Sequence, residues 1–148
     1  MNKLTIRNYH NSDEEPIIDL WFECGLAVPW NNPKQDIERK MDDDPDLFLV
    51  CEIKGRIVGS CMAGYDGHRG WIYYLAVKSE YQKQGIASRL VREAEHRLLK
   101  IGCPKIDLMV RKSNKDAISF YYKIGYKEDP VVVLSKRLYE DEPLKRNI

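Results

Sequence analysis

The feature that most constrains the fold is a short glycine-containing turn, Gln82-Lys83-Gln84-Gly85-Ile86-Ala87. An apolar, strand-like run precedes it at Trp71 to Val77, and an amphipathic helical run follows it from Ile86 to Ile101. A helix that begins directly after such a turn presents unpaired backbone N–H groups at the positive end of its dipole. No acidic side chain occurs from Tyr81 to Arg92, so the turn suits a phosphate. An ordinary strand-to-helix connection is the alternative interpretation.

The elements before this turn are predicted from apolar alternation and from helical spacing. They are a strand at 4–7, a helix from the cap at 11–13 to Gly25, a short helix at 34–41, and strands at 47–53 and 56–63. The two-residue connection Lys54-Gly55 predicts a hairpin between the last two strands. A glycine-rich turn at 64–70 then leads into the strand at 71–77.

The elements after the turn complete a mixed sheet. Residues 105–110 form a second apolar strand, and a strand–helix–strand unit of this kind has parallel strands. Asn114 is expected to cap a helix at 115–124, followed by a last strand at 131–138. The order β-α-α-β-β-β-α-β-α-β predicts an α/β fold with helices on both faces of the sheet. One domain is expected over residues 1–148, with a loosely ordered tail at 139–148.

The composition argues against several classes of function. Lysine and arginine total 24 against 23 acidic residues, so the net charge of +1 favours neither nucleic acid nor an anionic membrane as a partner. The four cysteines show no C-x-x-C and no metal-type spacing, which indicates free thiols and no metal site. No stretch approaches about 18 consecutive apolar residues, and no basic region precedes an apolar one at the N-terminus. A cytoplasmic location is therefore expected.

Two motifs on this element order resemble the GCN5-related N-acetyltransferase (GNAT) superfamily. The first is Gln82-x-x-Gly85-x-Ala87, which is similar to the family pattern that binds the pyrophosphate of coenzyme A. The second is Asn114-x-x-Ala117-x-x-Phe120-Tyr121-x-x-x-Gly125-Tyr126, which resembles the segment that follows the fifth strand in that family. More narrowly, the stretches at 29–31, 36–40 and 65–70 look like those of the small bacterial YpeA-type acetyltransferases.

The resemblance implies a binding site for acetyl-CoA as the acyl donor. The backbone around the turn would hold the pyrophosphate, at Gln82, Lys83, Gln84, Gly85, Ile86, Ala87 and Ser88. Pantetheine would pair with the backbone of Leu75, Ala76 and Val77, with Asn114, Ala117 and Phe120 also on the coenzyme side. A ligand at the carboxyl ends of parallel strands needs a gap, so the strand at 71–77 should diverge from residues 105–111.

Catalytic and acceptor residues are expected on the same basis. Tyr121 lies where the family often has a general acid for the leaving thiolate, and core packing is its alternative role. Some relatives carry a glutamate base where this chain has Met109, which cannot accept a proton. Asp66 and His68 are candidate bases, with structural roles in their turn as the alternative, and a water relay or an amine that arrives deprotonated would need no base. Candidate acceptor contacts are Trp30, Asn31, Asp36, Asp66 and His68.

The resulting hypothesis is an acetyl-CoA-dependent N-acetyltransferase that acts by direct attack in a ternary complex. Its acceptor would be a primary amine, on a small molecule or on a protein. The competing hypothesis is a non-catalytic acyl-CoA sensor or scaffold with the same fold, which the missing carboxylate at Met109 keeps open. The oligomeric state is left open, with a homodimer as one option.

Overall fold

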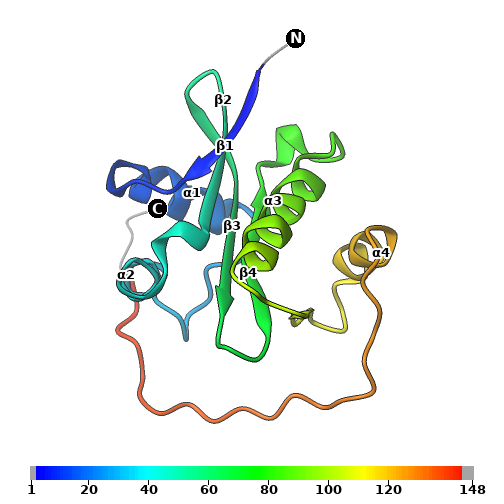
Figure 1. Cartoon of the computed structure of the whole chain (residues 1–148). Coiled ribbons are helices and arrows are strands. Elements are labelled where there is room, and N and C mark those ends of the chain that lie inside the picture. The colour runs from blue at the N-terminus through cyan, green and yellow to red at the C-terminus, as the bar shows by residue number, and fades with distance from the viewer. Residues whose placement is uncertain (1–2, 145–148) are drawn as a thin grey trace.

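A computed structural model of the chain describes residues 3–144, and it confirms the mixed α/β architecture (Figure 1). The five strands lie in the order β1-β2-β3-β4-β5, with β4 and β5 parallel and every other neighbouring pair antiparallel. The elements are β1 (Leu4–Asn8), α1 (Glu14–Glu23), α2 (Pro33–Asp43), β2 (Phe48–Ile53), β3 (Arg56–Tyr65), β4 (Gly70–Val77), α3 (Ile86–Lys100), β5 (Ile106–Asp107) and α4 (Lys115–Lys123). Within the described range, no helix is long and apolar enough to cross a membrane.

Helices cover both faces of the sheet, as the sequence predicts, because the central strands alternate apolar side chains between two cores. In β2, Phe48 and Val50 pack with α1 and α2, whereas Leu49 and Cys51 pack with α3. All four side chains are fully buried. A strand that is apolar on both faces must lie inside the sheet, so β2 and β3 form its centre.

The hairpin between β2 and β3 turns at Lys54-Gly55, as predicted. Both residues have positive φ, 52° and 75°. Two successive residues in this region are typical of the two-residue turn whose twist matches that of the flanking strands. The turn therefore sets the first two pairs of the hairpin, and the register shifts by one residue between Glu52 and Cys51.

The strand β4 contains a bulge that the sequence does not predict. Ser60 pairs with Ala76 and Met62 with Tyr73, so β4 has one more residue than β3 between these two pairs. Tyr74 lies in the bulge with a φ of 51°, a conformation that costs a non-glycine residue about 1–2 kcal/mol. The surrounding structure must compensate for this cost.

Buried hydrogen bonds and ring stacking hold the bulge. The Ser60 hydroxyl donates to the Tyr74 carbonyl at 2.8 Å and accepts from the Trp21 indole N–H at 2.9 Å. The rings of Trp21 and Tyr74 stack with their centroids 3.8 Å apart. Ser60 and Trp21 are fully buried, so water cannot replace either bond.

The parallel strand β5 is much shorter than the predicted run at 105–110. Only Ile106 and Asp107 pair with β4, opposite Gly70 and Trp71. Beyond Trp71, β4 reaches its bulge, and β4 and β5 separate. The predicted divergence of these strands is therefore present, and it begins after two residue pairs.

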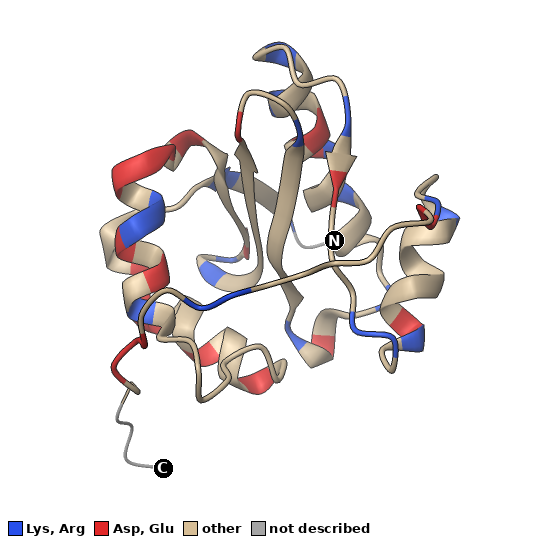
Figure 2. Ribbon diagram, turned by 90° about the horizontal axis from the view of Figure 1, so that it is seen from below, with Lys and Arg blue, Asp and Glu red and all other residues tan. Residues whose placement is uncertain are grey.

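The prediction of a final strand at 131–138 is wrong. This segment runs outside the sheet as an extended strap from α4 to α2 (Figures 1 and 2). Its two ends are anchored on opposite sides of the molecule, by Lys105 with Asp129 at 2.6 Å and by Arg39 with Asp141 at 2.5 Å. Residues 131–138 pair with no strand, and their apolar side chains are largely exposed.

The tail predicted as loosely ordered, 139–148, is described as far as Leu144. Within this part, the Asp141 carboxylate binds Arg39 and also accepts from the Asn32 backbone N–H at 3.1 Å. Leu144 packs against the core on the α1 and α2 side of the sheet. The described residues of the tail therefore have specific contacts, and residues 145–148 lie outside the described range.

Ser60→Ala should destabilise the fold by about 2 kcal/mol, because it leaves the Trp21 N–H and the Tyr74 carbonyl without partners in a buried site. Urea-induced unfolding followed by circular dichroism would measure this. Ser119→Ala, at an exposed position on α4, should change stability by less than about 0.5 kcal/mol. Equal stabilities of the two variants would contradict the role given to Ser60.

Candidate functional site

The N-terminus of α3 is an open site for an anion. The backbone N–H groups of Gly85, Ile86, Ala87 and Ser88 make no hydrogen bond with any described residue, and the first intrahelical bond is from Arg89 to the Gly85 carbonyl at 3.1 Å. The first turn of the helix contains no acidic side chain. Four unpaired donors at the positive end of a helix of 15 residues favour a phosphate group.

The turn before α3 shapes this site through two residues with positive φ. Lys83 has a φ of 63° and Gly85 a φ of 83°. A Cβ atom added at Gly85 would have nothing within 4 Å, so the space in front of the helix is empty. A side chain there would occupy the space that an incoming phosphate needs. The positive φ explains why glycine is favoured at position 85, and the close approach of a phosphate there stays a prediction.

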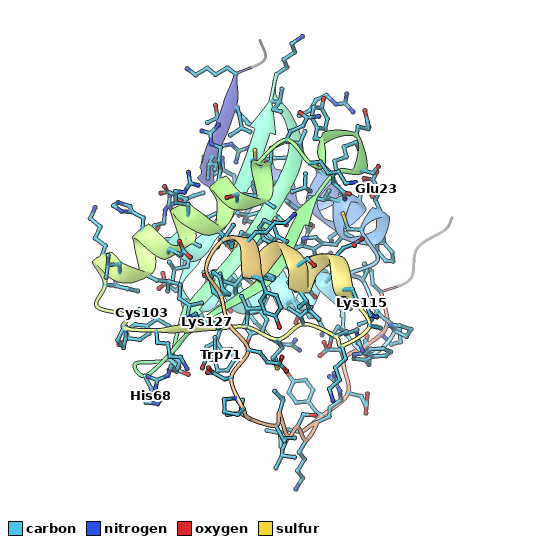
Figure 3. The ribbon with its side chains drawn as sticks, turned by 90° about the vertical axis from the view of Figure 1, so that its right-hand side faces the viewer. Glu23, His68, Trp71, Cys103, Lys115 and Lys127 are labelled. Atoms are coloured by element: carbon cyan, nitrogen blue, oxygen red, sulfur yellow. The ribbon has the colours of Figure 1, made fainter. Side chains whose placement is uncertain are left out.

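Two contacts tie the turn to neighbouring elements. The Gln82 amide donates to the Val77 carbonyl at 2.9 Å, which fixes the turn against the end of β4. The Glu23 carboxylate, at the end of α1, accepts from the Ser79 backbone N–H at 3.1 Å (Figure 3). Gln82 thus positions the loop through its side chain, while Lys83 and Gln84 are exposed at its surface.

The second predicted motif forms α4, on the other side of the gap beside β4. The Asn114 side chain accepts from the Ala117 N–H at 3.2 Å and caps the helix as predicted. Ala117 and Phe120 are partly buried. Phe120 makes an edge-to-face contact with Tyr121, with ring centroids 5.1 Å apart.

Tyr121 is the buried residue of α4. Its side chain packs in the core with α3 and is 9% exposed, and its ring meets Tyr126 edge to face at 5.4 Å. Its hydroxyl group has no hydrogen-bond partner among residues 3–144. Burial raises the pKa of this phenol above its usual value, with a smaller contribution from the Cys61 thiol. Tyr121 is therefore a protonated donor at neutral pH.

A cavity of about 660 Å³ lies on the opposite face of the sheet, beside α2. It combines apolar and aromatic walls with charged groups from α2. The lining residues are Leu26, Asn31, Asp36, Arg39, Lys40, Asp43, Met62, Ala63, Gly64, Tyr73 and Tyr74. Two of the predicted acceptor residues, Asn31 and Asp36, are in this lining. A cavity of this size accommodates a small-molecule ligand.

Trp30, also predicted at the acceptor site, does not line the cavity. Its ring is 48% exposed and lies under the Arg111 guanidinium, 5.6 Å from the ring centroid. This contact connects the loop between α1 and α2 with the segment before α4. Trp30 is therefore in a position to form part of an outer rim.

Asp66 and His68 lie in the turn between β3 and β4, and the structure gives Asp66 a structural role. Its carboxylate accepts from the backbone N–H groups of His68 and Arg69, at 2.8 and 2.7 Å, and from the Trp71 indole at 3.1 Å. The bonds from Arg69 and His68 lower the pKa of Asp66 to about 2. Such a carboxylate is a poor proton acceptor at neutral pH. His68 is exposed at the tip of the turn, away from the start of α4 at Lys115 (Figure 3).

Most residues of the cavity are absent from the sequence-based prediction, and Lys40 and Tyr74 are two of them with specific polar contacts. Lys40 is 8% exposed and donates to the Ala63 carbonyl, and burial lowers the pKa of its ammonium group. Its position three residues after Ile37, on the buried side of α2, is a signal that could have identified it. Tyr74 donates to Asp36 at 2.5 Å, and no sequence pattern indicates this contact.

Comparison with known proteins identifies the family. The sequence profile of the acetyltransferase (GNAT) family matches residues 10–126. A curated acetyltransferase of Sodalis glossinidius (strain morsitans) is 51% identical over 140 residues, which cover 94% of this chain and 99% of that protein. Another, from Pectobacterium atrosepticum, is 50% identical over 138 residues, which cover 93% and 98%. The chain therefore belongs to the GNAT acetyltransferase family.

Solved structures agree with this assignment at the level of the fold. The aminoglycoside N-acetyltransferase AAC(6′)-Iy, in its complex with coenzyme A, superimposes with a TM-score of 0.74 at 13% identity, covering 94% of this chain and 97% of that one. Ard1 from Thermoplasma volcanium gives a TM-score of 0.70 at 23% identity, covering 82% and 81%. As a GNAT member with these relatives, the chain is an acetyl-CoA-dependent N-acetyltransferase.

Gly85→Glu should weaken coenzyme A binding by at least about tenfold, because a carboxylate would enter the empty space that faces the free N–H groups. Isothermal titration calorimetry would measure the affinity. Gly55→Glu is the matched control, since Gly55 has a similar φ of 75° and similar open space in a hairpin turn. If both variants bind coenzyme A like the wild type, the phosphate does not lie at this helix.

Proposed function

We propose that this acetyltransferase moves the acetyl group of acetyl-CoA to the primary amine of a small molecule by direct attack within a ternary complex. The observation that carries the proposal is the position of β4 between two openings. The free N–H groups at the start of α3 lie beyond one end of β4, and the cavity on the α2 side is walled by Tyr73 and Tyr74 of the same strand. A donor and an acceptor bound in these openings would meet at β4.

The donor would extend from the α3 turn along β4. Its pyrophosphate would take the backbone N–H groups of residues 83–88, with the Gln82 side chain bracing the loop. Its pantetheine arm would pair with the backbone of Leu75, Ala76 and Val77, since β4 has no strand partner on the β5 side beyond Trp71. Asn114, Ala117 and Phe120 on α4 would close the other side of the gap.

The chemistry at this position is a single acyl transfer. The amine nitrogen attacks the thioester carbonyl carbon, the carbon–sulfur bond breaks, and the new amide forms while the thiolate leaves. An acyl-enzyme on cysteine is disfavoured, because burial raises the pKa of Cys51 to about 11 and that of Cys61 to about 12. Burial also raises the pKa of the Cys24 thiol. Direct attack is therefore the simpler route.

Tyr121 would protonate the departing thiolate of coenzyme A. Its hydroxyl is free of other partners in the described structure and is protonated at neutral pH, and burial, which raises its pKa, also makes it a weaker acid. The proton released by the amine would pass to water, since Asp66 already accepts three hydrogen bonds and has a low pKa. The cavity is open to solvent at Asp43, whose side chain is 76% exposed. No side-chain base is needed when the amine enters the cavity neutral.

A cytoplasmic location is part of the proposal. It fits the four cysteines, which are all free thiols, three of them buried. A monomer or a homodimer is compatible with a site built from one chain.

Tyr121→Phe should lower kcat for acetyl transfer by about a hundredfold while leaving the Kd of acetyl-CoA and the fold intact, because only an unpartnered hydroxyl is removed. Thiol release from acetyl-CoA, measured across a panel of amines, amino acids and polyamines, reports the rate. Tyr122→Phe is the control, since the neighbouring ring is 52% exposed. An unchanged kcat would mean that the thiolate leaves without Tyr121. Tight binding of acetyl-CoA by the wild type without turnover on any amine would instead favour the sensor hypothesis.

A further inference from the structure

The C-terminal segment is fastened to the wall of the cavity by a cluster of polar contacts. The Asp141 carboxylate, 5% exposed, pairs with the Arg39 guanidinium at 2.5 Å and accepts from the Asn32 N–H at 3.1 Å. The Asn32 side chain donates to the Glu142 carbonyl at 2.6 Å, and Arg39 also donates to the Tyr139 hydroxyl at 2.9 Å. Asp141 thus accepts from a backbone donor at the start of α2 and pairs with a cation further along the same helix.

Arg39 carries this contact into the cavity. It lines the cavity and donates to Asp36 on the preceding helical turn at 3.0 Å. The other oxygen of Asp36 accepts from the Tyr74 hydroxyl at 2.5 Å. A continuous chain of charge-assisted hydrogen bonds therefore runs from Asp141 through Arg39 and Asp36 to Tyr74.

The end of this chain is the bulge of β4. Tyr74 has its strained φ of 51° there, and its ring forms one wall of the cavity. Its carbonyl is held from the core by Ser60, whereas its hydroxyl is held by Asp36. The wall of the acceptor cavity is thus supported from the core on one side and from the C-terminal segment on the other.

The strap that leads to Asp141 adds little to the core. Its apolar residues are largely exposed, including Val132 at 84% and Leu134 at 89%. The ionic contact at Asp141 is therefore suited to positioning the cavity wall, and its loss should leave most of the core unchanged.

We propose that Asp141 is a positioning residue for the acceptor, which acts through Arg39 and Asp36 to hold Tyr74 against the cavity. This inference rests on the proposed function, in which the acceptor amine binds beside Tyr74. The Arg39 guanidinium lowers the pKa of Asp141, so the carboxylate is charged when the contact forms. The contacts of Asp141 do not involve the α3 turn, where the donor would bind.

Asp141→Asn tests this role, because it should change the KM of the acceptor and not that of acetyl-CoA. The acceptor used is the amine of the panel that the wild type acetylates fastest. Its KM should rise about tenfold, whereas the KM of acetyl-CoA should stay within about twofold. Glu140→Gln is the matched control, because Glu140 is the exposed neighbour on the same segment. Equal acceptor KM values for the wild type and Asp141→Asn would overturn the proposal, as would a parallel rise in both KM values.

A double-mutant cycle distinguishes a connected series of hydrogen bonds from two independent contacts. Tyr74→Phe removes the hydroxyl that donates to Asp36. If the hydrogen bonds through Arg39 and Asp36 connect the two residues, the double variant should raise the acceptor KM by clearly less than the product of the two single effects. Full additivity would contradict transmission through Arg39 and Asp36.

Hydrogen exchange does not depend on turnover, so it tests the role of Asp141 separately from the proposed function. Hydrogen exchange at the amides of residues 32–40 should become faster in Asp141→Asn and stay unchanged in Glu140→Gln. Faster exchange without turnover on any amine would support the contact and refute the proposed function. Unchanged exchange would refute the role of Asp141 even in an active enzyme.

Discussion

The arrangement of the site depends on the bulge in β4, where one extra residue interrupts the pairing with β3. Tyr74 is held there with positive φ because Ser60 binds its carbonyl and Trp21 stacks on its ring. The bulge redirects β4 just after its two pairs with β5, so the parallel strands separate. A gap on one side of β4 and a walled cavity on the other face follow from this local distortion.

In the proposed function, the two substrates bind on opposite faces of the sheet. On one face, α3 supplies backbone donors and α4 contributes Tyr121, which suits a long anionic donor. On the other face, α1 and α2 leave a cavity with charged groups from α2. In the proposed function the reacting atoms would meet at β4, because this strand contributes to both faces.

Much of the fold follows from local patterns in the sequence. The Lys54-Gly55 hairpin, the Asn114 cap and the free N-terminus of α3 are as predicted, because turn chemistry and capping act over a few residues. The strand predicted at 131–138 is absent, although its composition is β-rich. Strand propensity depends on a partner edge, and this segment runs from Asp129 to Asp141 without pairing with one.

The sequence by itself determined the free N–H groups at the start of α3, the proposed donor site, because a glycine turn before a helix creates such groups whatever surrounds it. The tertiary structure decided most of the cavity beside α2, the proposed acceptor site, although Asn31 and Asp36 were predicted from the sequence. Arg39 and Asp141 are 102 positions apart, and Tyr74 reaches Asp36 only after the sheet and α2 have packed. Asp66, a candidate base by residue type, is held instead by donors only two, three and five residues further along the chain, so its role in the turn is local. The contacts of Arg39 with Asp141 and of Tyr74 with Asp36 depend on packing, and no local spacing in the chain encodes them.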